Sequence, residues 1–69
     1  MDRTDVMHFL VFLEEAKEHE IIEKRDALAA LLGKINPRLD VSSDIRFCLR
    51  KIDEELVVRA EVLLRQGSK

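Results

Sequence analysis

Residues 6–13 read VMHFLVFL, an apolar run that only His8 interrupts. If the run is helical it has no polar face, so one neighbouring helix cannot bury all of its side chains. It continues into residues 14–32, which are rich in helix-forming residues and contain no turn signal. A buried strand is the alternative for the run, but the chain offers no second strand to pair with it. The run therefore predicts a helix that packs against more than one surface.

The size of the chain limits what can stabilise such a helix. A chain of 69 residues forms a single domain, here 1–69, and usually needs a disulfide, a metal, self-association or very regular helix packing. Cys48 is the only cysteine, which excludes an internal disulfide and is typical of a reducing compartment. The acidic start MDRTD and the shortness of the apolar run argue against a secretory signal and a membrane span. We expect a cytoplasmic helical protein that self-associates.

The first helical stretch ends at a cluster of turn-forming residues, GKINP at 33–37. We predict a helix over Asp5–Leu32, with Thr4 as its N-cap. Its apolar residues share one face at about 100° per residue and keep a single phase; they are Val6, Leu10, Leu13, Ile21, Leu28, Leu31 and Leu32. A bend near 18–24 is the alternative because this segment is polar, but no glycine, proline, serine or asparagine marks a break. One long first helix is therefore the prediction.

A second helix is predicted over Asp44–Gln66, after a loop at 33–43. Ser42 and Ser43 supply its N-cap, and Gly67 follows its last turn. Its apolar residues form a stripe on one face; they are Ile45, Cys48, Leu49, Ile52, Leu56, Ala60 and Leu63. The fold class is therefore all-α, a helical hairpin of two long helices. Two such hairpins would form a four-helix-bundle-like homodimer.

Several apolar side chains are in excess of these two stripes and predict a second contact surface. They are Met7, Phe9, Val11, Phe12, Phe47, Val58 and Val62. Because the chain contains no catalytic or cofactor motif, we interpret it as a small non-enzymatic interaction or regulatory module that acts as a homodimer and binds another protein. That protein would contact either the apolar set or the acidic stretch Glu14–Glu23. A structural subunit of a larger assembly is an alternative that the same features allow.

Residues 26–51 suggest a different function, DNA binding through a degenerate helix-turn-helix. The residues that match the spacing of this motif are Ala29, Gly33 and Leu39. The bases that would contact phosphates are Lys34, Arg38, Arg46, Arg50 and Lys51. The match fails at the expected recognition helix, where PRLDVSSD contains two acids and Ser42 occupies an apolar position. A DNA-binding regulator is therefore the alternative interpretation, not the preferred one.

Three polar features could carry chemistry, and each has a simpler interpretation. Glu15, His19 and Glu23 share one face of the predicted helix, but a single helix supplies too few converging ligands for a metal. Cys48 lies on the core stripe and would need a histidine and a cleft to act as a nucleophile. His8 could be a pH-sensitive interface residue, because imidazole side chains in general change charge near neutrality, but a structural histidine is more common in such a run. We expect no cofactor and no enzymatic activity.

Overall fold

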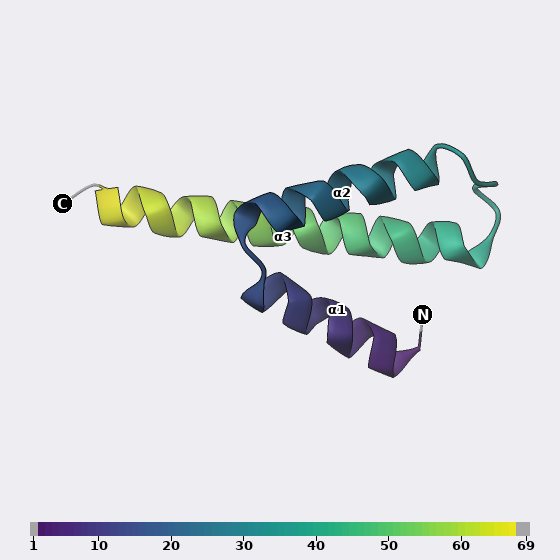
Figure 1. Ribbon diagram of the computed structural model, residues 1–69, viewed down its shortest axis with the longest axis horizontal. Helices are drawn as coiled ribbons and strands as arrows, with labels where there is room; N and C mark the ends of the chain where they lie inside the picture. The colour runs from purple at the N-terminus through teal and green to yellow at the C-terminus, as the bar shows by residue number, and fades with distance from the viewer. Residues whose placement is uncertain (1, 68–69) are drawn as a thin grey trace.

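The computed structural model describes residues 2–67 and consists of three helices there. Helix α1 spans Arg3–Glu15, α2 spans Glu18–Leu32 and α3 spans Asp40–Gly67. The prediction of an all-α fold is confirmed for the described residues. Helices α2 and α3 lie side by side and run in opposite directions, and α1 turns back below α3 (Figure 1). The last turns of α3 project beyond the beginning of α2.

The prediction of one continuous helix over Asp5–Leu32 is wrong. The helix is interrupted at Ala16 and Lys17, whose backbones are extended, with φ −71° and ψ 149° at Ala16 and φ −72° and ψ 157° at Lys17. This break comes just before the segment 18–24 that the sequence offered as a possible bend. No residue type at the break forces it, and the end of α1 is held by contacts with α3.

Two caps define the new helix ends. Asp2, and not Thr4, caps α1, because its Oδ1 accepts a hydrogen bond of 2.9 Å from the Asp5 backbone N–H. At the start of α2, the backbone N–H of Lys17 donates to Glu20 Oε1 at 3.2 Å. This is the returning half of a capping box, in which an N3 side chain satisfies the amide of the N-cap residue.

The α2–α3 connection explains why α3 begins at Asp40, four residues before the predicted Asp44. Asn36 organises the turn, since its Oδ1 accepts from the Arg38 amide at 2.9 Å and its carbonyl accepts from the Leu39 amide at 3.1 Å. The hydroxyl of Ser42 then donates to the Asn36 carbonyl at 2.8 Å. Ser42 is therefore a fully buried residue inside α3 and not its N-cap, as the sequence had suggested.

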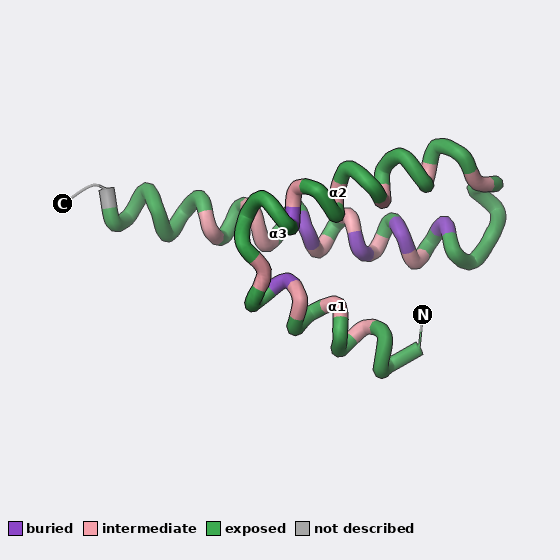
Figure 2. The backbone as a smooth tube through the Cα atoms, viewed as in Figure 1, coloured by how far each residue is buried: buried purple, intermediate pink, exposed green. Residues whose placement is uncertain are grey.

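The core is small and lies mainly where α3 faces α2 (Figure 2). Leu13, Ile21 and Ile52 form its centre, one from each helix, with Ile21 and Ile52 completely buried. Ile45 and Cys48 extend the buried face of α3 toward the turn. The last turns of α3 are exposed in the same view. The fold thus leaves one end of its longest helix without a covering element.

Candidate functional site

Apolar side chains gather on the part of α3 that extends past α2. We call residues 57–66 the arm. Val58, Val62 and Leu63 are apolar residues of the arm, with exposed fractions of 53%, 45% and 64%. Exposed apolar patches of this kind mark contact surfaces more often than they mark bare solvent-facing helices.

The arm continues the face of α3 that packs on α2. At about 100° per residue, Leu63 lies on the same face as Ile45 and Ile52, which are buried against the body of the protein. The stripe predicted from the sequence is therefore present along α3, but only its first part has a partner. Leu63 is exposed because the N-terminal end of α2 does not extend far enough along α3 to cover it, not because Leu63 points to the polar side of the helix.

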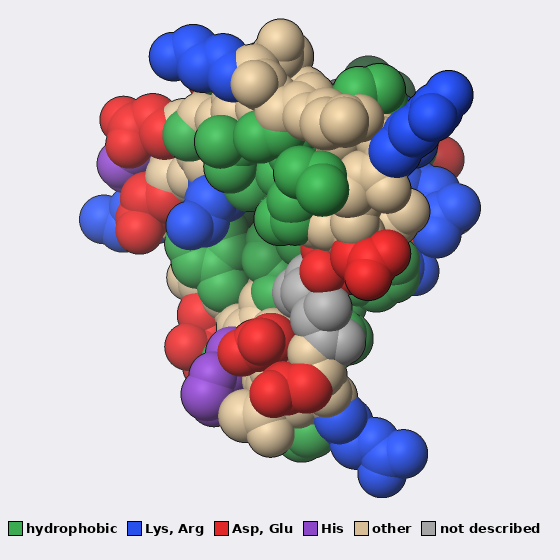
Figure 3. All heavy atoms as spheres, turned by 90° about the vertical axis from the view of Figure 1, so that its right-hand side faces the viewer, with side chains coloured by type: hydrophobic (Ala, Val, Ile, Leu, Met, Phe, Trp, Pro, Cys, Tyr) green, Lys and Arg blue, Asp and Glu red, His purple; other side chains and the backbone are tan. Residues whose placement is uncertain are grey.

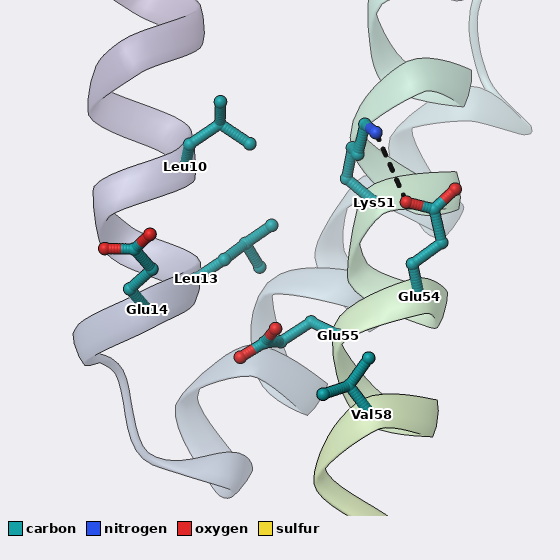
Figure 4. A pocket seen from close by; sticks show the side chains of 7 residues that line it. All are labelled: Leu10, Leu13, Glu14, Lys51, Glu54, Glu55 and Val58. Carbon is teal, nitrogen blue, oxygen red and sulfur yellow. Dashed lines mark hydrogen bonds and ion pairs between the residues drawn. The ribbon is translucent and has the colours of Figure 1, made fainter.

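A groove lies between α1 and α3, next to the base of the arm (Figure 4). It has a volume of about 290 Å³ and is lined by Leu10, Leu13, Glu14, Lys51, Glu54, Glu55 and Val58. Leu10 and Leu13 point from α1 toward α3, and Val58 and Glu55 point from α3 toward α1. Lys51 Nζ is 3.2 Å from Glu54 Oε2. The groove thus has apolar walls and a rim with three carboxylates and one ammonium group.

Arg59 holds the end of α1 against α3. Its Nη2 donates to the carbonyl oxygens of Leu13 at 2.8 Å and Ala16 at 2.9 Å, and its Nε donates to Glu55 Oε1 at 3.1 Å. A cation at a helix C-terminus satisfies carbonyls that lack an intrahelical donor and interacts favourably with the helix dipole. Together with burial of Leu13, this contact holds α1 in its bent position at Ala16 and Lys17.

The overall dimensions show how much surface remains uncovered. The accessible surface is 5467 Å², whereas a compact monomer of the same 8.0 kDa mass exposes about 4,500 Å². The radius of gyration is 13.8 Å, against about 11 Å for a compact domain of this length. The surplus of about 1,000 Å² is large for so small a protein.

The predicted interface residues fall into two groups. Met7, Val11, Val58 and Val62 are exposed, as a contact surface requires. The three phenylalanines are half-buried within the chain. Phe9 and Phe12 pack against the core cluster with ring centroids 6.4 Å apart.

Cations cover the exposed sides of two of these rings. Lys24 Nζ lies 5.8 Å from the centroid of the Phe12 ring. Arg50 and Lys51 lie 5.9 Å and 5.8 Å from the centroid of the Phe47 ring. Sequence reasoning missed Leu10 and Leu63 as surface residues because it assigned both to core stripes. Leu10 and Leu63 would have been recognised as exposed if α2 had been known to be shorter than α3. That difference in length follows from the break.

Of the candidate DNA contacts, Arg46, Arg50 and Lys51 are spread along α3, with Lys51 in the lining of the groove, and only Lys34 and Arg38 lie at the end of the molecule that carries the α2–α3 turn. Figure 3 looks at this end, where hydrophobic atoms gather in the middle and Lys and Arg side chains project at the edges. Lys34, Arg38, Arg46 and Arg50 are exposed, and Lys51 is half-buried. The expected helix-turn-helix is not formed, because α3 is one helix of 28 residues that runs beside α2, whereas that motif sets its helices at about 90–120°.

The remaining candidate residues are dispersed. The break separates Glu15 from His19 and Glu23, and residues 2–67 contain no group of three or more potential metal ligands. Cys48 is buried, and burial followed by the nearby Asp44 carboxylate raises the pKa of its thiol. His8 is exposed on α1.

The chain matches no protein-family model, and neither a curated protein nor a solved structure is significantly similar to it. Within residues 2–67, none of the helices combines the length and the apolar character that crossing a membrane requires.

Proposed function

We propose that this chain is a small non-enzymatic interaction module that pairs with a second copy of itself. The pairing surface consists of Leu10, Val58 and Val62, which lie in the α1–α3 groove and on the side of the arm that continues it. The observation that carries the proposal is the surplus of exposed area. It is about 1,000 Å², close to the ~800 Å² that each partner contributes to a standard protein interface.

A second copy suits this surface for two reasons. A two-fold interface uses the same patch on both subunits, so one apolar arm can pack against another. The arm also carries charges of both signs, at Arg59, Glu61 and Arg65. A patch of mixed sign does not repel its own copy as a patch of a single sign would.

The test compares two valines of the arm. Val62 and Val57 are both exposed, but they lie about 140° apart around the helix, and only Val62 is on the groove side. We expect wild type to scatter light at twice the monomer mass of 8.0 kDa at micromolar concentration, and Val62→Glu to scatter as a monomer with an unchanged circular dichroism spectrum. Val57→Glu is the control and should remain dimeric. A folded wild-type monomer at these concentrations would overturn the proposal.

DNA binding is the second candidate function, and one observation favours it. Residues 34–51 carry five bases against two acids, and all of these bases except Lys51 are exposed. If this segment binds a duplex, affinity will fall steeply with salt, because phosphate contacts release counterions. The double variant Arg46→Ala/Arg50→Ala should then lose binding. Absence of binding to any duplex at low salt would eliminate this candidate.

A further inference from the structure

The α1–α2 junction contains no residue that requires a break. Residues 14–20 read EEAKEHE, a sequence of good helix formers. The apolar residues on either side also keep one helical phase, since Leu10, Leu13 and Ile21 fall within about 80° of one another when the helix is drawn through the break. In the bent structure these apolar residues do not form one continuous face, because α1 and α2 point in different directions.

The register of α2 against α3 also pairs an apolar residue of α1 with an apolar residue of the arm. Ile21 of α2 packs with Ile52 of α3 in the core cluster, and the two helices are antiparallel. If α2 is extended backwards by 11 residues as a straight helix, it reaches Leu10, and α3 extended forwards by the same number reaches Leu63. Both side chains are apolar and exposed in the bent structure.

We infer that the junction at Ala16 and Lys17 straightens, so that α1 becomes the occupant of the arm. In this state a single helix, Arg3–Leu32, lies along α3 and places Leu10 beside Leu63. The lengths agree: 30 residues in the first helix and 28 in α3 correspond to about 45 Å and 42 Å. The inference concerns one chain and does not depend on pairing with a second copy.

The carbonyls that Arg59 binds at the junction have a donor in both states. In the bent state, Arg59 satisfies the carbonyls of Leu13 and Ala16. In a continuous helix the same two carbonyls accept from the amides of Lys17 and Glu20, which in the bent state donate to the Glu20 carboxylate and the Lys17 carbonyl. Straightening therefore replaces the Arg59 bonds and the cap of α2 by backbone bonds, and it releases Arg59. It also moves the apolar contacts of α1 from the groove to the arm.

Because Leu10 belongs to the groove in one state and lies beside Leu63 in the other, the two states have different binding properties. The bent chain offers the groove, with Leu10 and Val58 in its lining, and the straight chain takes the groove apart. Straightening thus opposes association through the groove, as an autoinhibitory contact does. The linkage is reciprocal, since a partner that binds only the bent state shifts the population toward it.

The test measures the distance between residues 7 and 66, which separates the two states. Spin labels are attached to Met7→Cys and Gln66→Cys in a Cys48→Ala background, and the labelled chain is diluted into excess unlabelled protein so that only distances within one chain are detected. In the bent state these positions lie toward opposite ends of a molecule 48 Å long. In the straight state the register places them opposite each other on helices about 8–10 Å apart.

A proline at position 18 locks the bent state. In that state Glu18 is the first helical residue of α2, where proline is tolerated, and Lys17 already has the extended backbone that precedes proline. In a straight helix the same proline removes an amide donor and clashes with the preceding turn. We expect Glu18→Pro to abolish the short distance, the matched control Glu18→Ala to retain it, and Arg59→Ala to increase it.

Two outcomes would overturn the inference. One is a long distance alone in wild type, Glu18→Ala and Arg59→Ala; the other is a short distance that persists in Glu18→Pro. The ¹³Cα chemical shifts of Ala16 and Lys17 in the unlabelled wild type provide a second measurement that needs no cysteine substitution. Shifts of purely extended residues, unchanged in Arg59→Ala, would contradict straightening in the same way.

Discussion

The α2–α3 pair and helix α1 are held by different kinds of contact. Along the pair, Ile21 and Ile52 are completely buried and Ser42 is buried with its hydroxyl hydrogen-bonded. Helix α1 contributes one buried side chain, Leu13, and a tether of two hydrogen bonds from Arg59. The pair is therefore a packed unit, and α1 is an attached element that can be released with less loss of buried area.

The largest effect is expected from the centre of the pair. Ile52→Ala removes a fully buried side chain that touches both other helices through the core cluster. Substitutions of this type cost about 2–5 kcal/mol, which is a large share of the stability of a small domain. Urea denaturation should show that most or all of the stability of the native state is lost. Val57→Ala, on the exposed side of the same helix, should change the free energy of unfolding little; an equal loss there would remove the distinction between core and arm.

The buried hydroxyl at the turn should have the next largest effect. Ser42→Ala removes one of the two donors to the Asn36 carbonyl, which keeps the Leu39 amide, and takes a hydrogen-bonded hydroxyl out of a fully buried position. We expect a loss of about 1–3 kcal/mol in the free energy of unfolding. The neighbouring Ser43 is exposed, so Ser43→Ala is the matched control. Equal denaturation midpoints for the two variants would contradict the role given to Ser42 in starting α3.

The tether should affect α1 and spare the pair. Arg59→Ala removes both hydrogen bonds to the end of α1, at a cost of about 1–2 kcal/mol for bonds with a charged donor. Amide hydrogen exchange should change at residues 3–15, because the bent state loses its tether, and should remain unchanged in the middle of α2 and α3. Arg46→Ala, at an exposed position of the same helix, should leave both regions as they are. A uniform increase across the molecule would mean that α1 and the pair unfold as one unit.

The smallest effect at neutral pH is expected from the buried thiol. Burial and the Asp44 carboxylate raise the pKa of Cys48 in the folded state, so folding favours the protonated form. The resulting stability is complete below the pKa of the unfolded thiol and is lost as pH rises through the raised folded pKa. The free energy of unfolding should therefore fall on the alkaline side, more in wild type than in Cys48→Ala. The same fall in both proteins would assign the effect to other groups.

Sequence reasoning succeeded where a pattern was local and repeated. The apolar stripe from Ile45 to Leu63 and the turn signal at 33–37 were enough to predict the all-α fold and a long last helix. The helix boundaries were less well predicted, because Ser42 resembles an N-cap in sequence and becomes a buried interior residue when its hydroxyl reaches Asn36. The candidate site was predicted in part: Val58 and Val62 were identified, whereas Leu63 was assigned to a buried stripe that α2 does not reach.

The sequence by itself determined the helical character of this protein, the phase of its apolar faces and the position of the α2–α3 turn, because these depend on residues a few positions apart. Only the tertiary structure decided that the first helical stretch divides at Ala16 and Lys17. Residues 14–20 favour a continuous helix, and the contact that holds the end of α1 comes from Arg59, which lies 46 and 43 positions from the carbonyls it binds. A contact between such distant residues leaves no mark on local periodicity, and it is this contact that leaves the arm uncovered.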